Sequence, residues 1–317
     1  MKRMLCLLAL LALLQASVFA EGAEMTQYLV SDGQKVFSPE ETEPFAEDAE
    51  LLTLRVCPLL GADCMLLTFG EHSMLIDSGG YNHGPTIMKV VQDAGLDSVE
   101  YAFNTHPHND HLGGMIPLLK LGLGVGTFMT TFPHDYVANK GEFEVLPETV
   151  RAMEAANIPV TDVKRDERIP FGDAEVTVLA IPETGTDLAG TCNELSAMLM
   201  VRYGTCSLLL TADVEPSSEK LLTEMYNLKA DILKYPHHGQ SKLEEAFYAE
   251  VAPELVFFTH GAGNTQMAQK QLGSLDMHRM LFATWGVITM QTDGTKWIVK
   301  QDLLPDFVQI AETYVFP

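Results

Sequence analysis

Three histidines and one aspartate lie within six residues, from His106 to His111, and this cluster constrains the fold of the chain more than any other feature. An extended backbone alternates its side chains, so His106 and His108 point to one side. Asp110 and His111 come round the following turn and face a second point nearby. Imidazole nitrogens and carboxylate oxygens suit Zn²⁺ and its first-row neighbours. The cluster therefore predicts a metal site in the loop that joins a strand to a helix.

Signals for strands and helices alternate from residue 51 onward. Short apolar runs between glycine-containing turns indicate strands, and apolar residues at helical spacing indicate helices. We expect strands over 51–57, 63–69, 73–77, 99–104, 125–130, 174–181, 196–203, 207–211, 231–235, 255–259, around 281, 287–291 and 296–299, and helices over 84–94, 112–121, 147–156, 217–226, 243–251 and 266–272. Both halves show this pattern, which favours an α/β fold in which two sheets pack face to face with helices outside, in four layers.

The first fifty residues differ in composition from the rest. Two basic residues, Lys2 and Arg3, precede an apolar run over 4–14, and small residues lead up to Ala20. This pattern predicts a signal peptide over 1–20, and no other stretch is long enough for a membrane span. Nine acidic residues within 21–50 predict an acidic flexible segment without chemistry. Residues 51–317 then form one domain of a secreted, extracytoplasmic protein.

The chain is strongly acidic, with a formal net charge of −23. Removal of residues 1–20 leaves 18 basic against 43 acidic residues, about −25. A protein this acidic repels the phosphate backbone, so we expect no stable binding of nucleic acid. A local metal charge could still bind one phosphate or carboxylate of a small substrate. The oligomeric state stays open.

Four cysteines remain after the predicted signal peptide: Cys57, Cys64, Cys192 and Cys206. None has the Cys-x-x-Cys spacing of a structural zinc site. Disulfides are permitted in an exported chain but are not needed by a domain of this size. Both buried free thiols and one or two bridges are compatible with the sequence.

The histidine cluster, with the two glycines that follow it, resembles the signature of the metallo-β-lactamase superfamily. Leu75–Gly80 is similar to the strand and turn that precede this signature, and Thr211–Asp213 to the superfamily's bridging-aspartate motif. The resemblance covers roughly residues 51–300. It implies a metallo-β-lactamase-like four-layer αβ/βα sandwich over 51–317 with hydrolase activity.

A finer resemblance is to the late-competence type, which includes the hydrolase domain of a DNA-uptake channel and secreted stand-alone hydrolases. Three segments carry this resemblance: Asn193-x-x-Ser196, Leu208–Asp213 and Lys234–Gly239. The chain carries no membrane channel, so only the hydrolase part applies.

The resemblance implies a set of metal ligands: His106 and His108 for one metal, Asp110 and His111 for the other, Asp213 as the bridge, and either His237 or His238 as a further ligand of the second metal. Two metals about 3.5–4 Å apart can hold a bridging hydroxide, which attacks an ester carbonyl or a phosphorus. Asp110 can also orient the water or take its proton.

One departure from the superfamily concerns the first metal. Most of its hydrolases carry another histidine shortly before the bridging aspartate, whereas 191–194 here contains none. Asn193 is therefore the candidate to face the first metal or its water, and we count it with Asp110 as catalytic. An oxygen-richer site binds zinc less tightly and could admit Mn²⁺. This departure argues against a true β-lactamase.

The sequence thus predicts an exported metal-dependent hydrolase of an ester or phosphoester, with a phosphodiester favoured and one or two Zn²⁺ ions as cofactor. The expected substrate is a small molecule or a surface polymer. A catalytically weak or inactive binding module with the same fold is the alternative, because the third histidine is missing. The other polar residues have separate expectations: Asp77 supports the metal loop, His72 is solvated in a turn and His278 lies on the surface. A place lining the cleft for His83, in a substrate loop for His134 and in contact with substrate for His260 stays an open alternative to a structural role.

Overall fold

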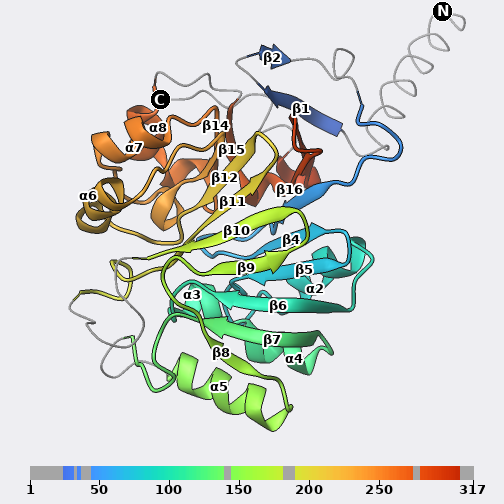
Figure 1. The fold of residues 1–317 in the computed structure, drawn as a ribbon, viewed down its shortest axis with the longest axis vertical. Coiled ribbons are helices and arrows are strands. Elements are labelled where there is room, and N and C mark those ends of the chain that lie inside the picture. Colours follow the sequence, from blue (N-terminus) through green and yellow to red (C-terminus); the bar gives the residue numbers. More distant parts are fainter. Residues whose placement is uncertain are drawn as a thin grey trace, which may run out of the picture.

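Two β-sheets lie face to face with helices on their outer sides (Figure 1). The computed structural model describes residues 24–31, 34–36, 44–138, 144–180, 190–273 and 279–307. The predicted four-layer α/β sandwich is confirmed. Residues 1–20, the predicted signal peptide, lie outside the described residues.

The first sheet has ten strands in the order β2-β1-β17-β16-β3-β4-β5-β6-β7-β8. Its central strands run antiparallel from β16 to β5 and parallel from β5 to β8. The strands are β1 (Glu24–Ser31), β2 (Gln34–Val36), β3 (Leu52–Val56), β4 (Met65–Phe69), β5 (His72–Ile76), β6 (Ser98–Asn104), β7 (Gly124–Thr130), β8 (Val160–Asp162), β16 (Gly286–Thr292) and β17 (Trp297–Leu303).

The second sheet has seven strands in the order β15-β14-β13-β12-β11-β10-β9. It is antiparallel from β9 to β12 and parallel from β12 to β15. The strands are β9 (Arg168–Phe171), β10 (Ala174–Leu179), β11 (Met198–Tyr203), β12 (Cys206–Leu210), β13 (Ile232–Lys234), β14 (Leu255–Phe258) and β15 (Met280–Phe282).

Seven α-helices and short 3₁₀ turns among the described residues link and cover the sheets. Helices α2 (Gly84–Asp93), α3 (Asn109–Leu112), α4 (Met115–Lys120) and α5 (Val145–Ala155) belong to the first half, and α6 (Pro216–Met225), α7 (Glu245–Val251) and α8 (Gln266–Gln271) to the second. The 3₁₀ turns are η2 (Pro236–Gly239), η3 (Ala262–Asn264), η5 (Ala283–Trp285) and η6 (Pro305–Phe307).

Apolar side chains form one core between the sheets and one on each outer side. The inner core contains residues of both sheets, such as Leu54 and Ile76 from the first and Val176 and Leu199 from the second. One outer core joins the first sheet to α2, α4 and α5, and the other joins the second sheet to α6, α7 and α8. The strands are held rigidly from both sides, so the loops at their ends are fixed in space.

The structure differs from two sequence expectations. Glu24–Ser31 lies in the segment expected to be flexible but forms β1, which pairs antiparallel with β17. An edge strand offers unpaired backbone groups to any neighbouring chain, and this pairing does not require an apolar sequence. The helix expected over 112–121 is two helices, because Gly113 and Gly114 separate α3 from α4. Among the described residues, none of the helices has the length and apolar character that a membrane crossing requires.

Candidate metal centre

The loop with the histidine cluster follows β6 and leads into α3. Strand β6 ends at Asn104, and α3 begins at Asn109, so the cluster lies where the chain leaves the first sheet. The chain passes very close to the end of β5 here, because a Cβ atom on Gly114 would lie 1.9 Å from the carbonyl oxygen of Ser78. Only glycine fits at this position. The close approach fixes the cluster against the first sheet.

His106 and His108 form a pair with two ring nitrogens facing each other. Nε2 of His106 lies 3.1 Å from Nδ1 of His108. His106 is fully buried, and His108 is partly buried. We call these two residues the histidine pair. Its two nitrogens can bind one cation from adjacent directions, as the alternation of side chains predicted.

Four other predicted ligands meet beside this pair, from both halves of the chain. Nε2 of His111 lies 3.2 Å from Oδ1 of Asp213, and Nε2 of His238 lies 3.3 Å from Oδ2 of the same carboxylate. Nε2 of His238 is also 3.2 Å from Oδ2 of Asp110. We call Asp110, His111, Asp213 and His238 the four-ligand group. The rings of His111 and His106 lie 4.0 Å apart between centroids, so this group adjoins the histidine pair.

Asp77 supports the cluster from the end of β5. Its carboxylate accepts a hydrogen bond from Nδ1 of His111 at 2.7 Å and from the hydroxyl of Thr105 at 2.7 Å. It also accepts from the side-chain amide of Asn104. Asp77 has a φ of 56°, a left-handed conformation that is costly for an aspartate. The bond to Nδ1 leaves Nε2 of His111 directed to the four-ligand group, which agrees with the expected supporting role of Asp77.

The sequence analysis missed a second pair of supporting residues, Asp63 and Lys234. Asp63 accepts a hydrogen bond from Nδ1 of His238 at 2.9 Å. It also forms an ion pair with Nζ of Lys234 at 2.6 Å. Nζ of Lys234 also donates to the carbonyl oxygen of Ala212 at 2.6 Å and lies 3.5 Å from Asp213. Both side chains are fully buried.

Ligand atoms of Asp63, His111, Asp213 and His238 all lie within 4.8 Å of one another. Asp63 therefore belongs to the cluster by distance, yet its two oxygens already accept bonds from Lys234 and His238. Because both of its oxygens are engaged, Asp63 is a supporting residue. Asp110 and Asp213 instead have oxygens close to the Nε2 atoms of the histidines. A charged lysine in an otherwise apolar strand was the one signal in the sequence for this pair.

Burial and neighbouring charges determine the protonation of the histidines. Burial, followed by the charge of His111, holds the pKa of His106 well below its usual range. Burial opposes protonation of His238 as well, but the carboxylates of Asp213 and Asp63 outweigh it and raise its pKa to about 10. The pKa of His111 is also raised, because Asp213 leads the carboxylates that outweigh its burial. Protons on His111 and His238 thus balance the carboxylates, at positions where a cation would replace them.

The two histidines of the Pro-His-His-Gly turn have different surroundings. Both have a positive φ, 48° for His237 and 54° for His238, and this backbone turns their side chains apart. The side chain of His237 is 30% exposed, and its Nε2 lies 3.9 Å from Asp213. His238 is fully buried in the four-ligand group. The geometry favours His238 as the ligand.

The side-chain amide of Asn193 has one bonded atom and one atom without a partner among the described residues. Its Nδ2 donates to Oε1 of Glu215 at 3.3 Å, and the residue is 7% exposed. Its Oδ1 has no hydrogen-bond partner among the residues that the structure describes. A buried amide oxygen without a partner is unfavourable, so this atom is suited to a cation or a water molecule.

The remaining histidines have the following surroundings. Nδ1 of His83 accepts a hydrogen bond from the backbone of Gly80, and the charge of Asp110 acts on its ring, which places it at the edge of the site. His260 is half-buried next to Gly61, and the charge of His238 acts on it. Both surroundings suit the expected positions lining the cleft.

His72 and His134 lie in other contacts. His72 begins β5, so the expected turn is wrong, while a third of its side chain stays exposed beside Glu100 at 2.7 Å. Its ring lies 5.6 Å from the ring of Phe171 between centroids. His134 pairs with Asp162 at 2.8 Å, a contact that does not test its expected place in a substrate loop. His278 lies outside the described residues.

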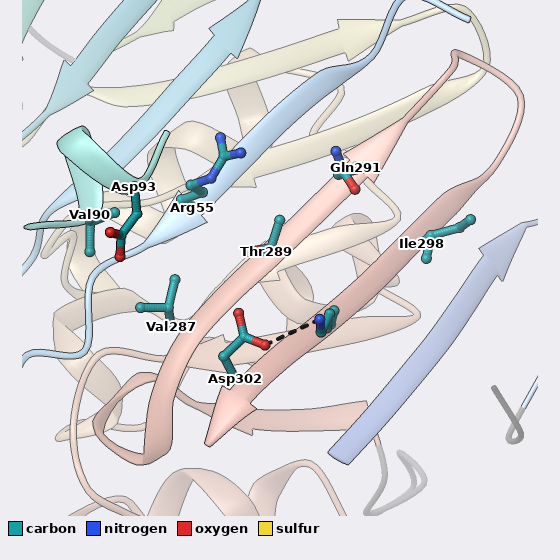
Figure 2. Close-up of a pocket in the computed structure, with 9 residues that line it drawn as sticks. Arg55, Val90, Asp93, Val287, Thr289, Gln291, Ile298 and Asp302 are labelled. Atoms are coloured by element: carbon teal, nitrogen blue, oxygen red, sulfur yellow. Dashed lines mark ion pairs between the residues drawn. The ribbon is translucent and has the colours of Figure 1, made fainter. Parts of the chain in front are cut away.

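A separate depression of about 330 Å³ lies on the side of the first sheet that faces away from the second sheet (Figure 2). It is lined by Arg55, Val90, Asp93, Val287, Thr289, Gln291, Ile298, Lys300 and Asp302. Its two acidic side chains are paired, Asp302 with Lys300 and Asp93 with Lys89. The depression shares no residue with the metal centre and has no cluster of metal-binding side chains.

Comparison with known proteins gives one family and one curated relative. The family model described as the metallo-β-lactamase superfamily matches residues 57–260. The ComE operon protein 3 of Bacillus subtilis (strain 168) is 28% identical over 225 residues, which cover 65% of this chain. The chain spans only 28% of the length of that relative. This match agrees with the resemblance to the late-competence type.

Solved structures also match this chain at low sequence identity. The metallo-β-lactamase fold protein YhfI from Bacillus subtilis is 14% identical, with a TM-score of 0.46, over 73% of this chain and 95% of that one. A diphosphatase of the PhnP family is also 14% identical, with a TM-score of 0.43, over 80% of this chain and 100% of that one.

Proposed function

Because the chain belongs to the metallo-β-lactamase superfamily, we propose that it is an exported metal-dependent hydrolase that cleaves an ester or phosphoester, with a phosphodiester favoured. One observation carries the proposal. The buried nitrogens of His111 and His238 lie 3.2 Å and 3.3 Å from the carboxylate of Asp213, next to the histidine pair. Nitrogen and oxygen ligands of this kind suit one or two Zn²⁺ ions.

The charge of the site supports a bound cation. Four carboxylates surround it: Asp63, Asp77, Asp110 and Asp213. Among the residues that the structure describes, Lys234 is the one buried ammonium in contact with them, so four negative charges face one fixed positive charge and three are left over. Buried charges need partners. Divalent cations supply that charge and leave the imidazoles neutral, as ligation requires. Mn²⁺ is a further candidate because the amide oxygen of Asn193 adds a hard ligand.

A bound metal would lower the pKa of water and polarise the scissile carbonyl or phosphoryl oxygen. The protein's own groups would do the rest. The side chain of Asp110 is 42% exposed, while that of Asp213 is 2% exposed. Asp110 is therefore the carboxylate that can both hold an attacking water and pass its proton to solvent. We propose that Asn193 accepts a hydrogen bond from that water through its Oδ1, which is supported by the bond that Glu215 accepts from its Nδ2.

The substrate class follows from charge and from the predicted export. An overall charge of −23 disfavours a long polyanion, whereas one phosphate or ester group would be attracted by the metals alone. We therefore propose a small molecule or an ester group of a surface polymer as substrate, outside the cytoplasm. The signal-like residues 1–20 support this location.

Metal content and turnover of the purified protein test the proposal together. We expect one or two equivalents of zinc and hydrolysis of bis-p-nitrophenyl phosphate that chelation abolishes. Variants His108→Ala and Asp110→Ala should lose most of this activity. His72→Gln, a histidine substitution at the Glu100 contact, is the matched control and should retain it.

Two outcomes would contradict the proposal. The first is a protein without metal whose activity survives both substitutions. The second is at most one equivalent of metal with no turnover of phosphoesters, lactones or thioesters, which would identify the binding module that lacks efficient chemistry. The absence of a third histidine at Asn193 is the observation that favours this second candidate.

A further inference from the structure

Two cysteines face each other where strands β3 and β4 meet their connecting loop. The last registered pair of these antiparallel strands is Val56 with Met65, so the next residues outward are Cys57 and Cys64. The backbone N–H of Cys57 donates to the carbonyl oxygen of Cys64 at 3.0 Å. Directly opposed residues on antiparallel strands point to the same face, with Cβ atoms about 4.5–5.5 Å apart.

The side chains are also in contact. The two thiols hydrogen-bond each other, and this contact, after burial, raises the pKa of Cys64. Each residue is 1% exposed, and both belong to the apolar core between the first sheet and its helices. The other two cysteines differ, because Cys192 contacts Tyr136 and Cys206 contacts Thr292. All four are free thiols in the structure.

We propose that Cys57 and Cys64 form an intramolecular disulfide that closes and stabilises the loop between β3 and β4. A disulfide needs Cα atoms about 4.4–6.8 Å apart, a range that directly opposed residues of an antiparallel pair satisfy at about 4.5–5.5 Å. Cys192 and Cys206 have no cysteine neighbour of this kind among the described residues and stay reduced.

The oxidant in this reaction is an external disulfide, such as glutathione disulfide or a protein disulfide. Two S–H bonds break and one S–S bond forms between Cys57 and Cys64. The two electrons reduce the external disulfide, and its two sulfurs take up the two protons. Exchange requires a thiolate that the oxidant can reach. Since both thiols are buried in the folded protein, oxidation occurs during folding, before the helices cover this face of the sheet.

The loop closed by this bond carries a residue that supports the metal centre. Asp63 directly precedes Cys64, and its carboxylate holds His238 and Lys234. The loop backbone is also bonded to the site, since the N–H of Asp63 donates to the carbonyl oxygen of Asp110 at 3.1 Å. A covalent bond between the two ends of the loop restricts its motion in every state of the protein. The position of Asp63 is thereby fixed.

Peptide mapping after controlled refolding tests the proposal. The reduced, unfolded protein is refolded in a buffer of glutathione and glutathione disulfide, then denatured with an alkylating reagent and digested. We expect Cys57 and Cys64 in one cross-linked peptide, lighter than the two thiol forms by two hydrogen atoms. Cys192 and Cys206 should be alkylated. Alkylation of Cys57 and Cys64, or a glutathione adduct on either, overturns the proposal.

Thermal unfolding provides a second measurement. Protein refolded with the disulfide should melt about 5 °C higher than protein refolded in reductant. The double variant Cys57→Ala, Cys64→Ala should lose this difference, and Cys206→Ala, the matched control, should keep it. Equal melting temperatures for the two wild-type forms contradict the stabilising role. If the double variant does not fold, the two wild-type forms and the peptide map decide the question.

Discussion

The histidine pair and the four-ligand group adjoin each other but are supported differently. In the four-ligand group, His111 is held by Asp77 and His238 by Asp63, and both carboxylates are buried. In the histidine pair, the residue in the position of the usual third ligand is Asn193, an amide. Hydrogen-bonded supporting carboxylates orient imidazoles and raise their basicity. We therefore expect the four-ligand group to bind a metal more tightly than the histidine pair.

The largest expected effect separates His238 from its neighbour His237. His238→Ala removes a buried member of the four-ligand group, and we expect hydrolysis to fall more than about 100-fold, beyond the usual loss for a supporting residue. His237→Ala should lower it much less, because this side chain is partly exposed and 3.9 Å from Asp213. Steady-state rates and zinc content of both variants measure this. Equal losses, or a greater loss for His237→Ala, would break the distinction between the two.

The next effect concerns Lys234. Lys234→Gln leaves Asp63 and Asp213 without their buried ammonium, so we expect metal affinity to fall about 10–100-fold. The metal-free variant should also unfold at a lower temperature, because buried carboxylates lose a partner. Competition with a fluorescent chelator measures affinity. Unchanged affinity would show that the lysine acts on the fold alone.

Asn193→His sharpens the comparison by supplying the missing imidazole. We expect the more weakly held metal to bind about tenfold tighter, while the affinity of the four-ligand group stays the same. Isothermal titration of zinc into the metal-free protein resolves the two sites. The control is Asn193→Ala, which should weaken only the same site. A change confined to the tighter site would show that Asn193 belongs to the other group.

The smallest expected effect lies outside the metal centre and concerns the pH dependence of the stability of the fold. Burial is the main cause that raises the pKa of Glu219, in α6, to about 8. The folded state thus holds a proton that the unfolded state releases near pH 4.5, so stability falls as the pH rises through this window. Glu219→Gln should remove that part of the pH dependence. Melting temperatures of both metal-loaded proteins at pH 5 and pH 8 measure it. Parallel curves for the two proteins would contradict the assignment.

The sequence predicted the fold and the candidate metal ligands better than the residues that support those ligands. The histidine cluster is local, so six residues sufficed to predict it, and the apolar strands beside it have a clear period. Asp63 and His238 are separated by 175 positions, and only the packing of the two sheets brings them together. Nothing near Asp63 in the sequence indicates that contact.

Backbone conformation explains the other failures. His237 and His238 are adjacent and chemically identical, so only the three-dimensional arrangement shows that His238 is buried and that His237 is partly exposed. Strand β1 was missed because its acidic surroundings predict a flexible chain, whereas its pairing with β17 uses backbone groups that composition does not report.

The bond between Asp63 and His238 also has a consequence for synthesis. A ribosome delivers the first sheet and the histidine cluster long before β13 and the turn that follows it. A partly made chain therefore holds His106, His108 and His111 without Asp213 or His238, and it can bind a metal only weakly. We therefore expect tight binding of a metal to require the last third of the polypeptide. A site that holds a metal would then show that both halves of the chain have been made and assembled.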